Sequence, residues 1–199
     1  MKSGREIDSA RVGEQLRAND KILILTHKSP DGDTLGTGAA LCRVLQQMGK
    51  QARVENSEPI PEKYRFLLEG LAQPDFDPEY IIAVDVADPK LLGDKLSVYA
   101  DRVDLCIDHH PSNLYYAKEV FCRPEDGAAA LTLYRILKEM GEPITPDIAT
   151  DLYTGLSTDT GCFRYSNTSS EALRVAADLI DAGADNAGSF TVHIKSQES

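Results

Sequence analysis

The sequence predicts an α/β fold in which a mostly parallel sheet carries helices on both faces. Short apolar runs such as "ILIL" at 22–25 and "IIAV" at 81–84 lack helical spacing, as buried strands do. Longer stretches with apolar residues at helical spacing separate them, and such alternation is typical of parallel sheets covered by helices. The chain has 199 residues, 42% of them hydrophobic and 27% charged, which suits one domain with a substantial core.

The predicted elements alternate along most of the chain. The strands are expected at 21–27, 51–57, 80–86 and 102–110, with 118–122 as an edge strand. The helices are expected at 34–50, 61–70, 89–99, 126–140, 146–158 and 169–183. Gly49 is a plausible C-cap, Thr145 a cap followed by Pro146, and Ser169 or Ser170 the cap of the last helix.

Composition excludes several classes of function. The formal net charge of -11 argues against broad affinity for long duplex nucleic acid, because phosphate neutralisation needs Lys and Arg. The apolar runs are too short to span a bilayer, and residues 1–16 lack the apolar core of a signal peptide. We therefore expect a cytoplasmic protein without a membrane partner. The cysteines lack metal-finger spacing, and Cys42 and Cys106 fall at core positions.

Ionisable residues follow three of the predicted strands. The first strand ends in His27, with Asp31 and Asp33 in the next turn, and the strand at 80–86 carries Asp85. The strand at 102–110 ends in three ionisable residues, Asp108, His109 and His110. Ligands of open α/β sheets bind at the carboxyl ends of the strands, so these side chains are expected to converge there.

Divalent cations would explain so many carboxylates in one place. Unscreened carboxylates repel one another, and oxygen and imidazole ligands suit Mn²⁺, Mg²⁺, Fe²⁺ or Zn²⁺. Two ions about 3.5–4 Å apart are the usual clamp of phosphoryl chemistry, and a carboxylate bridging both would set that spacing. Asp85 is the natural candidate for this bridge.

Each motif alone also has a purely structural interpretation. Asp31 and Asp33 could form a turn or cap a helix, Asp85 could cap the next helix, and the pair His109–His110 could lie on the surface. An EF-hand is excluded, because Leu35 and Cys42 stand where oxygen ligands are required. The glycines of "DGDTLGTG" do not form a P-loop, and close helix packing better explains Gly36 and Gly38.

Four motifs in order resemble those of the DHH phosphoesterases. They are His27-Lys-Ser-Pro-Asp31-Gly-Asp33, the lone Asp85, the triplet Asp108-His109-His110, and "GLSTDTGCFRYSN" with Asp159. The resemblance runs from about residue 10 to 183. It is greatest to the bacterial branch, relatives of the RecJ exonuclease, that degrades very short RNAs and dephosphorylates 3'-phosphoadenosine 5'-phosphate (pAp).

The resemblance implies roles for individual residues. One metal ion would be held by His27, Asp31 and Asp85, and a second by Asp33, Asp85, His109 and Asp159. Asp108 would orient an imidazole, as residues behind metal-binding histidines do. His110 would face the substrate phosphate, and Arg164 is a further candidate for a phosphate contact. The two ions are expected to be Mn²⁺, with Mg²⁺ as the alternative.

The resemblance also sets expectations about domains. Members of this branch continue into a second, substrate-binding domain with a glycine-rich histidine motif, and we find no such motif in residues 182–199. We therefore expect a DHH catalytic domain at 1–185 and a tail or the start of a linker at 186–199, with the C-terminal substrate-binding domain absent.

The leading hypothesis is a metal-dependent phosphoesterase that hydrolyses short oligoribonucleotides, pAp, or both, by water activated between two metals. The alternatives are a pyrophosphatase or polyphosphatase of the same superfamily, and a non-catalytic module that binds metal or nucleotide. The expected partner is a short RNA or small nucleotide substrate, and the sequence is compatible with a homodimer.

Overall fold

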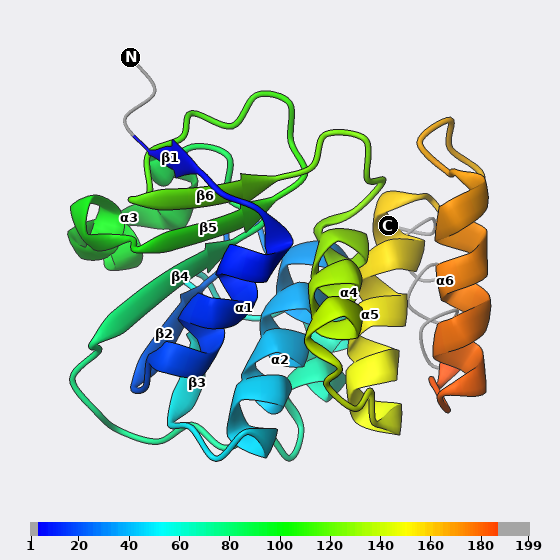
Figure 1. The fold of residues 1–199 in the computed structure, drawn as a ribbon, viewed down its shortest axis with the longest axis horizontal. Helices are drawn as coiled ribbons and strands as arrows, with labels where there is room; N and C mark the ends of the chain where they lie inside the picture. Colours follow the sequence, from blue (N-terminus) through cyan, green and yellow to red (C-terminus); the bar gives the residue numbers. More distant parts are fainter. Residues whose placement is uncertain (1–3, 187–199) are drawn as a thin grey trace.

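A computed structural model describes residues 4–186 of the chain (Figure 1). Within that range a six-stranded sheet has the order β1-β6-β5-β4-β2-β3, and every neighbouring pair is parallel. This confirms the predicted α/β fold with a parallel sheet. The strands are β1 (Arg5–Glu6), β2 (Ile22–Leu25), β3 (Ala52–Glu55), β4 (Tyr80–Val84), β5 (Leu105–Asp108) and β6 (Glu119–Cys122).

Helices and strands alternate as far as β5, after which β6 follows directly and α4, α5 and α6 come in succession. The α-helices are α1 (Ser9–Ala18), α2 (Gly32–Gln47), α3 (Gly93–Leu96), α4 (Ala129–Met140), α5 (Pro146–Asp159) and α6 (Ser170–Asp181). The 3₁₀ helices are η1 (Glu62–Leu68), η2 (Pro89–Leu92) and η3 (Ser97–Arg102).

The two faces of the sheet are covered unequally. Alternate strand residues point to opposite faces. Ile22 and Ile24 face the larger core, which the long helices α1, α2, α4 and α5 cover, while α6 packs outside against α4 and α5 (Figure 1). Leu23 and Leu25 face a smaller core beneath the short helices η2, α3 and η3. Helices therefore lie on both faces, but only one face carries a thick helical layer.

The N-terminal residues form elements that the sequence analysis did not anticipate. Helix α1 begins after Asp8, whose side chain accepts a hydrogen bond from the amide of Arg11, and it buries Val12 and Leu16. Strand β1 pairs with β6. The prediction of 118–122 as an edge strand is therefore wrong, because β6 lies between β1 and β5.

Two predicted helices differ in type from the expectation. The segment 61–70 forms the 3₁₀ helix η1, which starts with a hydrogen bond from the amide of Tyr64 to the carbonyl of Pro61. The segment 89–99 is broken into η2, α3 and η3. Gly93 adopts φ +77° at the first break, which a continuous right-handed helix does not allow.

Two other expectations concern the chain as a whole. The prediction for residues 186–199 lies outside the described residues apart from Asn186. Among residues 4–186, no helix combines the length and the apolar character that crossing a bilayer requires.

Close packing of α2 against α5 gives the candidate site its frame. A Cβ atom on Gly36 of α2 would lie 2.3 Å from the carbonyl oxygen of Asp151 in α5, so only glycine allows this approach. The prediction that Gly36 serves close helix packing is confirmed. Because α2 begins and α5 ends with candidate ligands, this contact fixes the distance between them.

The substitution Gly36→Ala is expected to lower the free energy of unfolding by about 1–3 kcal/mol, because the added methyl group must push α2 and α5 apart. Urea denaturation of the two proteins measures the difference. Gly13→Ala in α1 is the matched control, since its Cβ would meet the flexible Met140 side chain at 3.0 Å. Equal losses of stability in both variants would contradict this account.

Candidate metal centre

The candidate site lies at the carboxyl edge of the sheet, where β2 and β4 run side by side. After β2 the chain passes through α2 to β3, which lies on one side of the β2–β4 pair. After β4 it passes through η2, α3 and η3 to β5, which lies on the opposite side of that pair. Ligands of open α/β sheets bind at such a switch in strand order. Residues that follow β2, β4 and β5 therefore share one crevice with the C-terminal end of α5.

The first donor group consists of His27, Asp31 and Asp85. The Nε2 atom of His27 lies 3.5 Å from Asp31 Oδ2 and 3.4 Å from Asp85 Oδ2. Asp31 is also the N-cap of α2, since its Oδ1 accepts from the amides of Asp33 and Thr34. The cap interpretation and the ligand interpretation are thus compatible, because each uses a different carboxylate oxygen.

The second donor group consists of Asp33, His109 and Asp159, with Asp85 beside it. The Nε2 atom of His109 lies 3.6 Å from Asp33 Oδ2, 3.4 Å from Asp85 Oδ1 and 3.3 Å from Asp159 Oδ2. Asp159 is the last residue of α5 and is far from the other donors in the sequence. The structure therefore brings together all six residues that the resemblance implies as metal ligands.

Asp33 is fixed by the start of another helix. Its side chain is fully buried, and its two oxygens accept the amide hydrogens of Ala129 at 2.6 Å and Ala130 at 2.9 Å. The hydroxyl of Thr37 donates to the same carboxylate at 3.2 Å. The positive end of α4 thus stabilises a carboxylate that has lost its contact with water.

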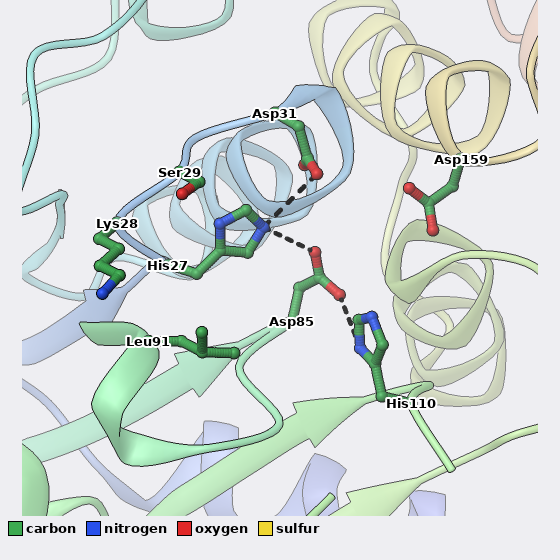
Figure 2. A pocket seen from close by; sticks show the side chains of 8 residues that line it. All are labelled: His27, Lys28, Ser29, Asp31, Asp85, Leu91, His110 and Asp159. Carbon is green, nitrogen blue, oxygen red and sulfur yellow. Dashed lines mark ion pairs between the residues drawn. The ribbon is translucent and has the colours of Figure 1, made fainter. Parts of the chain in front are cut away.

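Asp85 lies between the two donor groups. Its backbone has φ +58°, an uncommon conformation that aspartate tolerates better than most residues. One carboxylate oxygen faces His27 and the other faces His109. Figure 2 shows Asp85 between His27 and His110, with Asp159 pointing toward the same space from α5.

Two buried atoms at this point lack hydrogen-bond partners within residues 4–186: Asp85 Oδ1 and His109 Nε2. An unsatisfied buried polar atom is costly, and such atoms in native structures often mark an ion or water site. Three sets of residues here each offer donor atoms that lie within 4.8 Å of one another, and Asp85 belongs to two of these sets. They are His27, Asp31 and Asp85; Asp33, His109 and Asp159; and Asp85, His109 and His110. Carboxylate and imidazole donors in this arrangement fit divalent cations.

The charges of the cluster shift its pKa values. Burial lowers the pKa of His27, but the contacts with Asp31 and Asp85 outweigh it and raise that pKa to about 10. Burial likewise opposes ionisation of His109, yet Asp159 and Asp85 raise its pKa to about 12. Burial and the charge of Asp85 raise the pKa of Asp33 well above its usual value. These shifts all express the crowding of negative charge in the crevice.

Asp108 holds His110 at the mouth of the cluster. Its Oδ1 lies 2.8 Å from His110 Nδ1, and its Oδ2 accepts from Asn113 at 2.6 Å. The hydrogen bond to Asp108 raises the pKa of His110. A protonated imidazole half-exposed to the pocket can stabilise an anion. Asp108 orients His110, whereas the ring of His109 is held by the carbonyl of Asp126 at 3.1 Å.

A pocket of about 220 Å³ opens on the donor groups. Lys28, Ser29 and Leu91 form part of its rim (Figure 2). The other residues that line it are His27, Asp31, Asp85, His110 and Asp159. Four of the six candidate ligands thus line the pocket, whereas Asp33 and His109 are not among its lining residues.

Arg164 is not among the residues that line this pocket. Its side chain is exposed on the turn after α5, and its Nε donates to the carbonyl of Gly161 at 2.9 Å. The structure therefore gives the suggested phosphate contact of Arg164 no support in its geometry.

Several supporting residues escaped the sequence analysis. The buried Tyr64 side chain lies close to Gly32 at the start of α2 and to Thr158 at the end of α5. Asn113 donates to Asp108, which in turn holds His110, and the carbonyl of Asp126 holds His109. No spacing rule connects these residues with their partners, because the contacts arise only when the loops fold over the sheet edge.

Comparisons with known proteins agree with this geometry. Residues 21–156 match the model of the DHH family, N-terminal domain. A bifunctional oligoribonuclease and PAP phosphatase from Thermus thermophilus is 34% identical over 180 residues, which cover 86% of this chain and 53% of that protein. A probable manganese-dependent inorganic pyrophosphatase from Streptococcus mutans is 28% identical over 177 residues, covering 83% of this chain and 56% of that protein.

A solved structure supports the same fold. The crystal structure of an exopolyphosphatase-related protein from Bacteroides fragilis superimposes with a TM-score of 0.79 at 23% identity, covering 93% of this chain and 59% of that one. The chain spans about half the length of the curated relatives it matches. The matched residues include every donor from β2, β4 and β5, and on this basis the chain belongs to the DHH family.

Proposed function

We propose that the chain is the catalytic part of a metal-dependent phosphoesterase that hydrolyses short oligoribonucleotides and pAp. The observation that carries the proposal is the pair of donor groups that share Asp85, with unpartnered atoms directed between them. The relative from Thermus thermophilus, named an oligoribonuclease and PAP phosphatase, supports this choice of substrates.

The donor atoms divide into two proposed ion sites. His27, Asp31 and Asp85 would hold one divalent ion. Asp33, Asp85, His109 and Asp159 would hold the other, with Mn²⁺ favoured by the imidazole ligands and by the manganese-dependent relative. When bound, such a pair supplies Lewis-acid stabilisation of phosphoryl oxygens and makes water a stronger nucleophile.

The protein's own side chains prepare the reaction in other ways. His110 faces the pocket with its Nδ1 held by Asp108, which raises the pKa of the ring and so favours the cationic form that can stabilise the charge developing on the phosphoryl group. Buried Asp33 and the turn at Asp85 are rigid, which keeps the donors in place before substrate arrives. Water adds to phosphorus as the bond from phosphorus to the ribose 3'-oxygen breaks. That oxygen takes a proton and leaves as a hydroxyl group, and the phosphate departs on a 5'-mononucleotide or as inorganic phosphate.

Inorganic pyrophosphate is the second candidate substrate, because one relative is named a probable pyrophosphatase. The two candidates differ in what must surround the reacting phosphate. A nucleotide presents a base and a ribose, whereas pyrophosphate is compact and entirely anionic. Rates measured with pAp, a 5'-labelled diribonucleotide and pyrophosphate in the presence of Mn²⁺ distinguish the two.

Asp85→Asn is expected to weaken binding of both Mn²⁺ ions, because the amide turns a donor NH₂ group toward one of them. We expect a loss of at least about 100-fold in affinity by isothermal titration calorimetry, since changes behind the ligands alone cost 10- to 100-fold. Asp31→Asn should weaken only one ion. Asp178→Asn, a change on α6 outside the donor groups, is the control and should bind as wild type does.

The affinity for Mn²⁺ is expected to rise with pH through neutrality. The pKa of His27 is raised to about 10 and that of His109 to about 12, so each imidazole must lose a proton to bind an ion. Each apparent binding constant should therefore increase roughly tenfold per pH unit. Calorimetry in buffers with different ionisation heats counts the released protons, and a count of zero would refute this account.

His110→Ala is expected to reduce kcat for diribonucleotide hydrolysis by about 10²- to 10³-fold, the usual effect of removing one charge-stabilising donor. Binding of Mn²⁺ should remain within a factor of a few, because His110 belongs to neither proposed ligand set.

The same assay tests the proposed function. Wild-type protein that binds two ions but hydrolyses no phosphoester would indicate a non-catalytic binding module. Wild-type protein that binds no ion and hydrolyses nothing would reject the metal-dependent mechanism.

A further inference from the structure

The loop between β6 and α4 contains a buried carboxylate that belongs to neither donor group. Asp126 is only 3% exposed. Its carboxylate accepts hydrogen bonds from the hydroxyl of Thr132 at 3.0 Å and from Arg135 Nη2 at 3.0 Å. Arg123 Nε donates to it at 3.2 Å. Two guanidinium groups and a hydroxyl therefore anchor this one side chain.

The hydrogen bonds of the Asp126 carboxylate connect the loop to the helical layer. Thr132 and Arg135 lie on α4, and Arg135 also forms an ion pair with Glu171 on α6. Arg123 follows β6 directly. The Asp126 carboxylate thus ties the loop to the strand that precedes it and to the helix that follows it.

The main chain of the same residue reaches the second donor group. The carbonyl oxygen of Asp126 lies 3.1 Å from Nδ1 of His109. A carbonyl can only accept, so this contact requires a proton on Nδ1. The Nε2 atom then remains as the ring's ligand atom, directed toward Asp33, Asp85 and Asp159.

The loop also fixes Asp33. Two and three residues beyond Gly127, the amides of Ala129 and Ala130 donate to its two carboxylate oxygens. Ala128, the N-cap of α4, provides no side-chain acceptor, so Asp33 satisfies the first turn from another helix. The loop therefore orients the imidazole directly, and by placing the first turn of α4 it also orients the carboxylate of the same group.

We propose that Asp126 is a positioning residue for the second ion site, the one formed by Asp33, Asp85, His109 and Asp159; this inference rests on the proposed function. Its carboxylate sets the position of the loop, and the loop sets His109 and Asp33. The first ion site, at His27 and Asp31, receives no contact from Asp126 among the described residues. The expected consequence is a selective effect on one ion.

The test compares Asp126→Asn with Asp151→Asn. Asp151 is also buried, at 2% exposure, and is paired with Arg43 at 2.8 Å, but it lies in neither donor group. Both variants remove a buried, arginine-paired carboxylate, so both should lower the melting temperature. Titration with Mn²⁺ follows the two ions. The reference variants Asp31→Asn and Asp159→Asn, each lacking a donor from one group, identify which ion is affected.

Asp126→Asn is expected to weaken the second ion by about 10- to 100-fold and to leave the first unchanged. Asp151→Asn should leave both unchanged. If Asp126→Asn does not fold, Thr132→Val removes one hydrogen bond to the same carboxylate and should shift the same ion in the same direction by a smaller factor. Equal weakening of both ions, or no weakening of either, would overturn the proposal.

A second readout needs no metal. The chain has 4 histidines, so ¹⁵N-histidine labelling gives a simple spectrum. The Nδ1–H signal of His109 should be protected from exchange in the wild-type and Asp151→Asn proteins and lost in Asp126→Asn. If the wild-type protein binds no Mn²⁺, the proposed function fails. This spectrum then decides alone whether Asp126 positions His109, and an unchanged signal would refute that role.

Discussion

The concentration of like charge around Asp85 is the constraint on which this structure depends. Asp31, Asp33, Asp85 and Asp159 meet in one crevice, where Asp33 and Asp85 are buried and Asp31 and Asp159 are half-buried. Four carboxylates cannot stay ionised together in a buried place without compensating positive charge. The surrounding structure supplies part of it, through the imidazoles of His27 and His109 and the amides at the start of α4. A divalent ion bound as proposed would provide the remainder.

The parallel sheet explains why residues so distant in sequence can meet. Strands β2, β4 and β5 are neighbours or next neighbours and point the same way, so their ends deliver side chains to one edge. Asp159 arrives differently, from the end of α5. Its place depends on the close contact between α2 and α5 at Gly36, which sets how far the two helices can slide. The site is therefore built from both layers of the fold, the sheet and the long helices.

The sequence was informative where chemistry follows regular elements. The donors at 27, 31, 33, 85 and 109 could be located because each follows a recognisable buried strand. Asp159 came only from family resemblance, since a helix end carries no such signal. Strand β1 was missed because two residues show no periodicity, and its pairing removed β6 from the edge. Asp126 was missed because its main-chain carbonyl, which any residue possesses, makes the decisive contact.

The capping of α4 by Asp33 couples secondary structure to the chemistry of the crevice. Helix α4 has no acceptor of its own at its first turn and takes one from α2. Fraying of that turn and displacement of Asp33 are consequently the same event. Asp33 cannot leave its place while the first turn of α4 keeps its hydrogen bonds, so the order of this one ligand depends on the main chain of a helix as well as on side-chain packing.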